Sequence, residues 1–555
     1  MAGVSNRSGR WRWTALAAAL VVLDASLTFN NLWPTPGVSW NGELSVELAV
    51  CVLAMAFGSR WFGPPSRPML GLVAALWVLL VVGRYGEVTA PALYGRQINL
   101  YWDARHVSAV AAMLVRVASV WAIFLALAAA ALIPFLLHAV LRWAFGRVTD
   151  AMGRLRERRA LVLLASVAVL WFVGQRLDNR FPAVPRFSTP VTQTYARQAR
   201  LLARELASRG AVTLGPGPSF DSDLARVRGA DVFLIFVESY GAVSFDRPEF
   251  ADRLAASRAR LEADIRATGR GVVSAYVESP TFGGASWLAH VSLMSGIEAR
   301  DEDTNVLLMS QKRDTLVTTF ARHGYRTVAV MPGLQEDWPE GGFYGFDDIY
   351  GNKRLEYDGP PFGWWSIPDQ FTIARLDALE VARQARPPVF VFFPTIGTHT
   401  PFTPTAPYQP DWARVLTKRP YDQTDVDRAW DQVPDWLNLG PSYVQALSYA
   451  YTSLGGYLRL RGDRDFIMIL IGDHQPPAAV SGGLAPWDVP VHVIASRKDT
   501  LVRLRAHGFR SGLSPAHPVV TRMHQLLPVL LDAFGEPEKS TQPVFQAESK
   551  ARLRD

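Results

Sequence analysis

The chain has 555 residues, with 57 lysines and arginines against 50 aspartates and glutamates, and 49% of its residues are hydrophobic. This length corresponds to several domains, and the apolar fraction excludes a disordered or collagen-like chain. The single cysteine, Cys51, excludes an intramolecular disulfide framework and any CxxC zinc or redox site. Only 19% of the residues are charged, and the apolar residues concentrate in the first third. We therefore expect a membrane domain followed by a soluble domain.

Apolar stretches in the first third predict a multi-pass α-helical membrane domain over residues 1–176, with about five transmembrane helices. A span needs about 20 apolar residues, so the first and fourth stretches are long enough, and the others need flanking residues. A cleaved signal peptide is the alternative for the first stretch, but the four stretches that follow favour an uncleaved anchor. The five stretches are residues 13–32, 44–57, 69–82, one within 108–140, and 160–173.

The positions of the arginines predict the orientation of these spans. Cytoplasmic loops carry an excess of lysine and arginine, and arginines such as Arg7, Arg60 and Arg147 precede the first span or lie in the second and fourth loops. With five spans and the N-terminus inside, the chain after about residue 175 lies outside the cytoplasm. The net charge of +7 then reflects topology and not a nucleic-acid surface. Asp24, inside the first span, is either functional or a buried polar contact.

Three further regions follow the membrane domain. Residues 177–229 form a predicted linker with a helix near the membrane at 195–209, residues 230–540 form a soluble domain, and residues 541–555 form a polar tail. In the soluble domain, near-continuous apolar strands alternate with helices, which predicts an α/β fold with a mostly parallel sheet buried on both faces. The expected strands are 231–237, 272–277, 327–331, 389–393, 466–471 and 491–494. The expected helices are 251–267, 286–295, 314–323, 369–384, 443–460 and 519–534.

Ligands bind at the carboxyl ends of the strands in such folds, and two polar residues lie in segments that follow predicted strands. Glu238 follows the strand 231–237, where a carboxylate is costly unless it is solvated or coordinates something. A solvated strand end or a helix cap is the alternative for this residue. His399 follows the strand 389–393 and is placed to donate to an anionic substrate or a leaving group, or it is a turn histidine.

A glycine-rich turn precedes the predicted helix 286–295. Gly283 and Gly284 allow the backbone to approach a ligand closely, and we expect Ser286 to be the N-cap of a helix that Gly296 closes. The N-terminus of that helix suits a phosphate or a sulfate. The hydroxyl of Ser286 is a nucleophile only if something, such as a metal ion, lowers its pKa, and a plain N-cap is the alternative.

Ser286 is preferred to the nearby hydroxyls of Ser279 and Thr281, because it alone follows the glycine pair and opens a helix. A further polar pair, Asp473 and His474, closes the strand 466–471. Adjacent aspartate and histidine side chains at the end of a buried strand can both turn toward one cation, as an oxygen and a nitrogen ligand.

The order of these groups resembles the alkaline phosphatase and sulfatase superfamily. More closely, the chain is similar to its membrane-anchored phosphoglycerol transferase branch, the lipoteichoic acid synthase type, which has five spans and an extracytoplasmic sulfatase-like domain. The resemblance covers nearly the whole chain, including HGYRTVAVM, GFDDIYG and IPDQF. It implies one divalent metal ion, Mn²⁺ in preference to Zn²⁺ or Mg²⁺, held by Glu238, Ser286, Asp473 and His474. The nucleophile of the family is usually threonine, and Ser286 stands at that place.

Two departures from the family pattern concern the substrate. Lipoteichoic-type relatives carry a Trp-x-Arg element that grips glycerol phosphate, whereas Trp338 is followed by Pro339 and Glu340; the tryptophan can still stack on substrate. Sulfatases carry a C/S-x-P-x-R element, which Ser286 lacks, and this argues against sulfate ester hydrolysis. His290, one turn after Ser286, is expected to have a core or supporting role.

The resemblance implies a plasma (inner) membrane transferase of the cell envelope. It would move a phosphoglycerol-like head group from a membrane phospholipid to a glycan or polymer acceptor through a phospho-serine, with His399 and Trp338 as substrate-binding residues. Phosphoethanolamine transfer, phosphodiester hydrolysis and sulfatase-type hydrolysis on the same site are alternatives. A non-catalytic domain that binds polymer or proteins is an alternative of another class, and no nucleic-acid partner is expected.

Overall fold

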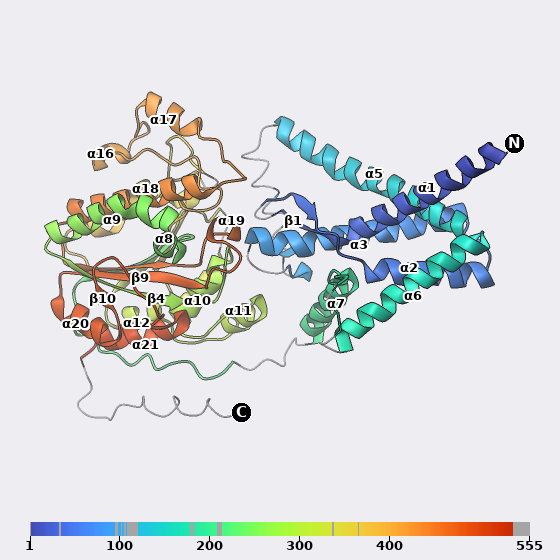
Figure 1. Ribbon diagram of the computed structural model, residues 1–555. Coiled ribbons are helices and arrows are strands. Elements are labelled where there is room, and N and C mark those ends of the chain that lie inside the picture. The colour runs from blue at the N-terminus through green and yellow to red at the C-terminus, as the bar shows by residue number, and fades with distance from the viewer. Residues whose placement is uncertain are drawn as a thin grey trace. The chain divides into compact units, whose positions relative to one another are not determined.

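The computed structural model divides the chain into two compact units, Met1–Ala211 and Val212–Asp555, and each is described by itself (Figure 1). The predicted tail 541–555 and much of 108–119 lie outside the described residues. The residues that the structure describes are 2–32, 35–94, 98–101, 103–104, 107, 111, 120–177, 181–182, 184–207, 214–335, 338–363 and 366–536.

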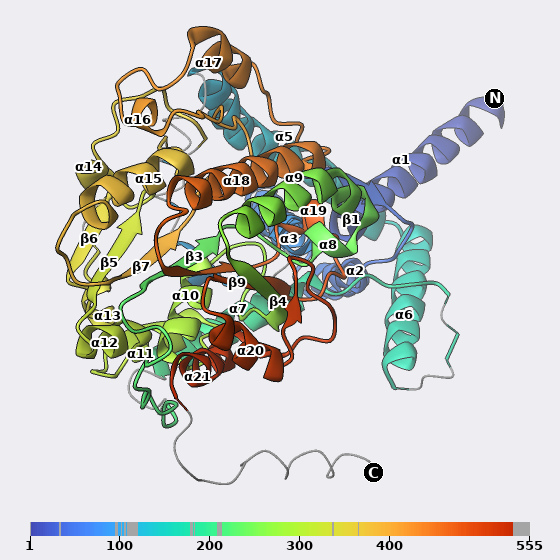
Figure 2. The same cartoon turned by 90° about the vertical axis from the view of Figure 1, so that its left-hand side faces the viewer.

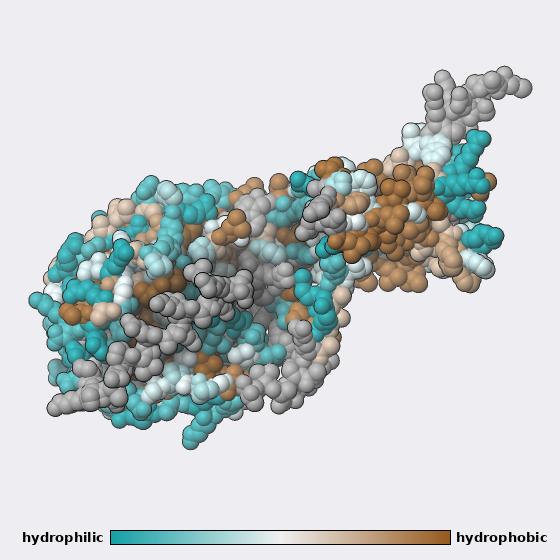
Figure 3. All heavy atoms as spheres, turned by 60° about the horizontal axis from the view of Figure 1, so that its bottom comes forward, coloured by the Kyte–Doolittle hydropathy of each residue, from teal (hydrophilic) through white to brown (hydrophobic). Residues whose placement is uncertain are grey.

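The first unit is built from helices with one short hairpin. A buried apolar cluster between the helices includes Leu23, Trp77 and Phe145, whereas other apolar side chains, such as Leu127 and Leu164, face outward. A broad brown area in Figure 3 marks this apolar surface over the helices. The elements are α1 (Ala2–Thr28), β1 (Phe29–Asn31), β2 (Val38–Trp40), α2 (Val46–Trp61), α3 (Arg67–Tyr94), α5 (Val120–Met152), α6 (Leu155–Leu177) and α7 (Val191–Ala207).

Three helices of the described chain are long and apolar enough to cross a membrane, Arg67–Ala92, Ile123–Met152 and Leu155–Leu177. They contain the third and fifth predicted stretches and the described part of the fourth. The first and second stretches form α1 and α2. Because α2 has 16 residues, it extends over about 24 Å at ~1.5 Å per residue, less than the ~30 Å of a hydrocarbon core. The number of spans and their orientation stay predictions.

The second unit contains a nine-stranded sheet in the order β10-β4-β9-β8-β3-β7-β5-β6, with β11 beside β4. The five neighbouring strands β8, β3, β7, β5 and β6 are parallel, and β9 is antiparallel to both β8 and β4. The mostly parallel sheet expected from the sequence is therefore present. The strands are β3 (Asp231–Val237), β4 (Gly271–Glu278), β5 (Arg326–Met331), β6 (Asp348–Gly351), β7 (Val389–Pro394), β8 (Phe466–Gly472), β9 (Asp488–Ala495), β10 (Arg510–Ser511) and β11 (Thr521–Arg522).

Strand direction brings five loops to one edge of this sheet. Because β9 is antiparallel to both of its neighbours, β4 and β8 run in the same direction, and β8 is parallel to β3. The carboxyl ends of β4, β8, β3, β7 and β5 therefore all lie at one edge. The segments that follow them contain Ser286, Asp473, Glu238, His399 and Trp338, respectively.

Helices cover both faces of the sheet, as Figures 1 and 2 show. Alternate residues of β3 enter different cores, because side chains of a strand point to opposite faces in turn: Phe233 packs with one layer and Leu234 with the other. The first layer is α9 (Pro248–Ala267), α15 (Asp369–Leu376) and α18 (Gly440–Leu460). The second is α10 (Ser286–Ser295), α12 (Leu316–Arg322), α20 (Lys498–Ala506) and α21 (Met523–Phe534).

Short elements complete the second unit, and most of them were not expected from the sequence. A π-helical turn, η1, continues α15 and completes the predicted helix 369–384 in part. These elements are α8 (Val243–Asp246), α11 (Glu302–Met309), α13 (Gly341–Tyr344), α14 (Asn352–Leu355), η1 (Asp377–Val381), α16 (Trp412–Val415), α17 (Gln423–Trp430) and α19 (Ala478–Ser481).

Candidate active site

Glu238 lies directly after β3 and is only 8% exposed, so the solvated strand end that was the alternative is wrong for this residue. Its main chain is bound on both sides by the loop after β7. The N–H of Glu238 donates to Thr395 Oγ1 at 3.1 Å, and Thr398 Oγ1 donates to the carbonyl of Glu238. Since its backbone is fixed, the carboxylate is held at the carboxyl edge of the sheet, where Oε1 accepts from Ser239 Oγ at 3.1 Å.

Asp473 and His474 follow β8 and are each 1% exposed. Asp473 Oδ1 accepts main-chain hydrogen bonds from Ser239 at 2.8 Å and from His474 at 2.7 Å. His474 Nδ1 lies 2.7 Å from the carbonyl oxygen of Gln475. A carbonyl oxygen only accepts, so Nδ1 carries a proton, and Nε2 presents its lone pair to the site only when the ring is neutral.

The hydroxyl of Ser286 contacts the side chains of Glu238 and His474. Ser286 Oγ donates to Glu238 Oε2 at 3.0 Å and lies 3.2 Å from His474 Nε2. The expected N-cap role is wrong, because Ala285 occupies that position in a left-handed conformation with φ of 59°. Ser286 is therefore the first residue inside α10. Its side chain is directed to the cluster of Glu238, Asp473 and His474, which we call the acidic group. Gly296 closes the helix, as expected.

The two competing hydroxyls are hydrogen-bonded to the main chain. Ser279 Oγ donates to the carbonyl of Asp473, and Thr281 Oγ1 donates to the carbonyl of Gly284 at 2.6 Å. Gly284 has φ of +149°, which side-chain-bearing residues rarely adopt. This turn brings Ser286, and not Thr281, against Glu238.

Glu238, Asp473 and His474 form a group that fits a divalent metal ion. One ligand atom from each lies within 4.8 Å of the others, with His474 Nε2 3.3 Å from Glu238 Oε1 and 3.8 Å from Asp473 Oδ2. Carboxylate and hydroxyl oxygens suit Mg²⁺ and Mn²⁺, and imidazole suits Zn²⁺. Because Nδ1 of His474 is already committed to a carbonyl, Nε2 is the atom that would bind a metal ion, which is the usual arrangement of a metal-binding histidine.

The electrostatics of this group also fit a cation. Burial, together with the charge of Glu238, raises the pKa of Asp473 well above its usual range. Burial would lower the pKa of His474, but the charge of Asp473 and the hydrogen bond to Glu238 raise it to about 9. Burial opposes ionisation of Glu238 too, yet the charge of His474 takes its pKa below the usual range. Protons therefore supply the positive charge here that a metal ion would supply on binding.

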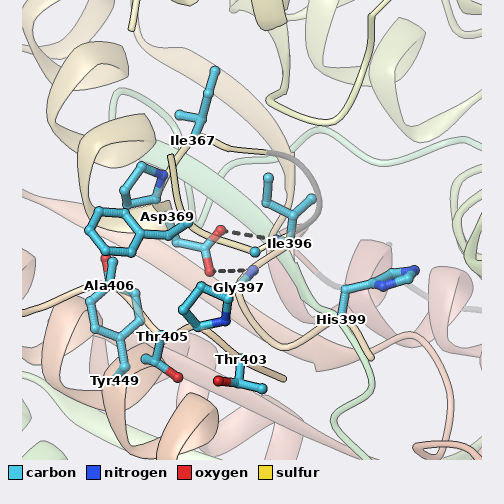
Figure 4. Close-up of a pocket in the computed structure, with 13 residues that line it drawn as sticks. Ile367, Asp369, Ile396, Gly397, His399, Thr403, Thr405, Ala406 and Tyr449 are labelled. Carbon is cyan, nitrogen blue, oxygen red and sulfur yellow. Dashed lines mark hydrogen bonds between the residues drawn. The ribbon is translucent and has the colours of Figure 1, made fainter. Parts of the chain in front are cut away.

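His399 lies in the loop after β7 and lines a cavity of about 30 Å³, which is space for about two water molecules at ~10–15 Å³ each. Asp369, Thr403, Thr405 and Tyr449 line the same cavity (Figure 4). His399 Nδ1 lies 2.7 Å from the carbonyl of Thr400 and so carries a proton. Its charge acts on Glu238, whose pKa it lowers. The structure thus brings His399 near the acidic group.

Trp338 lies in the loop after β5, and its described ring contact is with Tyr344 and not with a residue of the acidic group. Its ring centroid is 5.5 Å from that of Tyr344, and the side chain packs against the core below the sheet. A substrate-binding role of Trp338 stays a prediction.

His290 is packed in the core beneath the acidic group, as expected. Its ring centroid lies 4.5 Å from that of Phe236 and 5.3 Å from that of Phe392. Burial lowers its pKa to about 3, so the ring is neutral at physiological pH. Its Nε2 has no hydrogen-bond partner among the described residues.

Three residues of the site were missed by sequence reasoning, Thr395, Thr398 and Asp369. The threonines fix the main chain of Glu238, and Asp369 binds the same loop from the other side. The available signal was weak: Thr395 and Thr398 follow β7 at the ligand-binding edge, and Asp369 stands in IPDQF.

Comparison with known proteins finds one family model that matches part of the second unit. A family model described as Sulfatase matches residues 290–492, a range that contains Asp473 and His474 and begins just after Ser286. Residues 290–492 are therefore sulfatase-like, in agreement with the resemblance seen in the sequence. We refer to the unit that contains them, Val212–Asp555, as the sulfatase-type domain. No curated protein matches the chain.

Three solved structures illustrate the similarity. The lipoteichoic acid synthase LtaP from Listeria monocytogenes is 13% identical over 52% of this chain and 71% of that chain, with a TM-score of 0.35. The integral membrane protein lipooligosaccharide phosphoethanolamine transferase A (EptA) from Neisseria meningitidis is 13% identical over 83% of this chain and 82% of that chain, with a TM-score of 0.44. The phosphoglycerol transferase GacH from Streptococcus pyogenes is 12% identical over 62% of this chain and 81% of that chain, with a TM-score of 0.34.

Proposed function

We propose that this protein transfers a phospho-head group, of the phosphoglycerol kind, from a membrane phospholipid to a hydroxyl of a glycan or polymer. The transfer takes place at the outer face of the plasma (inner) membrane and proceeds through a phosphorylated Ser286. The observation that carries the proposal is the position of Ser286 Oγ, 3.0 Å from Glu238 Oε2 and 3.2 Å from His474 Nε2. A serine hydroxyl needs such neighbours to become a nucleophile.

Glu238, Asp473 and His474 would hold the divalent metal, with Mn²⁺ preferred. When bound, the metal would neutralise charge on the phosphoryl oxygens and lower the pKa of the serine hydroxyl. The main-chain hydrogen bonds to Asp473 and Glu238 hold these side chains in place before the substrate arrives, so little reorganisation is needed during the reaction.

In the first half of the reaction, Ser286 Oγ attacks phosphorus of the lipid phosphodiester. The bond from Oγ to phosphorus forms, and the bond from phosphorus to the diacylglycerol oxygen breaks. The proton of Ser286 leaves along its hydrogen bond to Glu238 and passes to water. Because Nδ1 of His399 is held by Thr400, protonated His399 presents Nε2–H to the leaving oxygen, and diacylglycerol departs with that proton.

In the second half, the acceptor hydroxyl attacks phosphorus of the phospho-serine. Neutral His399 takes the proton of the acceptor, the bond from phosphorus to Ser286 Oγ breaks, and the serine regains a proton from water. The membrane-capable helices of the chain support a lipid donor, since they keep the sulfatase-type domain beside a bilayer.

The test is to trap the intermediate with labelled donor lipid and no acceptor. The full-length protein in nanodiscs receives Mn²⁺ and either phosphatidylglycerol or phosphatidylethanolamine, each labelled in the head group. We expect mass spectrometry to find the label on Ser286 in the wild type and in Thr281→Val, and not in Ser286→Ala. Ser286→Thr should keep part of the turnover, because threonine offers the same hydroxyl.

Two results would count against this proposal. Label on Thr281, or undiminished turnover by Ser286→Ala, would place the nucleophile elsewhere. The labelled lipid that reacts identifies the donor head group. Release of the head group into water at a rate that added glycan acceptors do not change would identify a phosphodiesterase instead of a transferase.

A further inference from the structure

The carboxylate of Asp369 binds the main chain of the loop that carries His399. Asp369 is the first residue of α15 and is only 2% exposed. Its Oδ1 accepts from the N–H of Ile396 and its Oδ2 from the N–H of Gly397, each at 2.9 Å (Figure 4). Hydrogen bonds from main-chain N–H groups to an ionised carboxylate are short and about twice as strong as neutral ones. Asp369 therefore fixes two successive residues of this loop.

Gly397 is matched to this carboxylate. A Cβ at position 397 would lie 2.5 Å from Asp369 Oδ2, so any side chain there would push the loop away from the carboxylate. The close approach needs both an acidic side chain at 369 and the absence of a side chain at 397. These two positions are 28 residues apart in the sequence.

The same loop is also bound to the main chain of β3 and of Glu238, the residue that follows it. The N–H of Thr395 donates to the carbonyl of Phe236 at 2.8 Å, and Thr398 Oγ1 donates to the carbonyl of Glu238. The loop is thus held between Asp369 on one side and the main chain of Glu238 on the other.

The loop then turns into His399. The N–H of His399 donates to the carbonyl of Ile396 at 3.1 Å. Ile396 therefore binds Asp369 through its N–H and His399 through its carbonyl. A shift at Ile396 is transmitted to His399 by this hydrogen bond. The same shift reaches Glu238 through Thr395 and Thr398.

We propose that Asp369 is a positioning residue that sets the places of His399 and Glu238 for group transfer without touching the substrate. This inference rests on the proposed function, since it assigns His399 and Glu238 to that reaction. The expected effect is large for a side chain that does no chemistry, because a displacement of about 1 Å in a reacting group costs about 100-fold in rate.

The hold of Asp369 on the loop depends on its ionisation. Burial raises the pKa of Asp369 to about 6, the charge of Glu238 raises it as well, and the hydrogen bonds from Ile396 and Gly397 oppose this. His399 and Tyr449 line the same cavity. Below about pH 6 the carboxyl is protonated, one oxygen becomes a donor, and the contact with the two N–H groups weakens. Turnover should therefore fall as the pH drops through about 6.

The test compares Asp369→Asn with Asp377→Asn in the full-length protein in nanodiscs. Asp377 is a matched control, because it is a buried aspartate in the turn that continues α15 and binds Arg461 and Tyr457 instead of the loop. We expect Asp369→Asn to lower kcat about 100-fold while KM for the donor changes less than about threefold. The fall in turnover near pH 6 should disappear in this variant, because asparagine does not titrate.

Asp377→Asn should lower Tm but keep the wild-type kcat and the fall near pH 6. A second variant, Gly397→Ala, should reduce kcat by itself, and its effect should shrink in an Asp369→Ala background, where the clashing carboxylate is gone. Additive effects of these two substitutions would overturn the proposal. So would a wild-type kcat and pH profile in Asp369→Asn.

Hydrogen exchange separates failure of this inference from failure of the proposed function. Peptides covering residues 395–399 should exchange faster in Asp369→Asn than in the wild type, whatever reaction the enzyme performs. Unchanged exchange would refute the positioning role even if Ser286 is labelled by the donor. Faster exchange together with no labelling of Ser286 in the wild type would refute the proposed function and leave the contact of Asp369 with the loop intact.

Discussion

Asp473 and His474 are adjacent in sequence, yet their side chains point toward each other, because hydrogen bonds to the main chain fix both of them. Asp473 Oδ1 accepts from the N–H of His474 and of Ser239, which leaves Oδ2 directed to His474 Nε2 at 3.8 Å. The ring of His474 is held by Gln475. Two candidate ligand atoms of different type, an oxygen and a nitrogen, are thereby held in place, as binding of one metal ion would require.

The metal prediction follows from this arrangement. Asp473→Ala removes one buried carboxylate and the acceptor that aligns the N–H groups of Ser239 and His474, so we expect loss of both metal retention and turnover. Metal content by mass spectrometry after gel filtration, and donor turnover before and after chelation, check this. Full activity of the variant, or of exhaustively chelated wild type, would contradict the assignment of Glu238, Asp473 and His474 as ligands.

Sequence reasoning located the residues of this group from their places after apolar strands. Glu238, Ser286, Asp473 and His474 lie together because the strands before them end at one edge of the sheet. Asp369 could not be inferred in this way. Its carboxylate acts on main-chain N–H groups 27 and 28 residues away, and no residue pattern marks such a contact.

At the scale of elements, the sequence predicted strand positions better than strand directions. The apolar runs that became β3 and β8 were placed within a residue of their observed ends. The antiparallel direction of β9 was not predicted, because a buried apolar strand has the same pattern in either direction. The observed connection fits this direction, since only the four-residue helix α19 lies between β8 and β9, whereas the crossover between parallel neighbours is usually formed by a full α-helix.

The end of β8, where the strand meets the acidic group, allows a test of how an element positions the site. A Cβ at Gly472 would overlap the main-chain oxygen of Tyr240, and Val489 Cβ lies close by, 3.1 Å from that Cβ. Gly472→Ala should therefore push the end of β8 away from the turn that follows Glu238. We expect a loss of about 1–3 kcal/mol in the free energy of unfolding, as for other overpacked sites, together with weaker metal retention.

Urea unfolding and metal titration measure these two effects of Gly472→Ala. Gly342→Ala is the matched control, because a Cβ at Gly342 meets nothing within 4 Å. It should leave the unfolding free energy within about 0.5 kcal/mol of the wild type and metal retention unchanged. If the two alanine variants have the same unfolding free energy and the same metal retention, the close approach of β8 to Tyr240 does not hold the acidic group in place.

At the scale of the whole molecule, the proposed function depends on which side of the membrane the sulfatase-type domain occupies. Composition predicted the division into a helical and an α/β part, because apolar helices and alternating strands and helices differ over long windows. It could not set the number of spans. The helix α2 has only 16 residues, and α1 contains arginines in its first half. These two helices are therefore not among the three, within α3, α5 and α6, that are long and apolar enough to cross a membrane.

Reporter fusions along the chain test the topology. Fusions after Arg159 should be cytoplasmic and fusions after Pro190 external, because the apolar helix α6, Leu155–Leu177, lies between the arginine-rich loop and the linker. Fusions after Gly42 should be external and fusions after Ser66 cytoplasmic if α1 and α2 both span. A cytoplasmic position of the reporter after Pro190 would contradict the proposed transfer, since the lipid donor and the glycan acceptor would then lie on the opposite side of the membrane from Ser286.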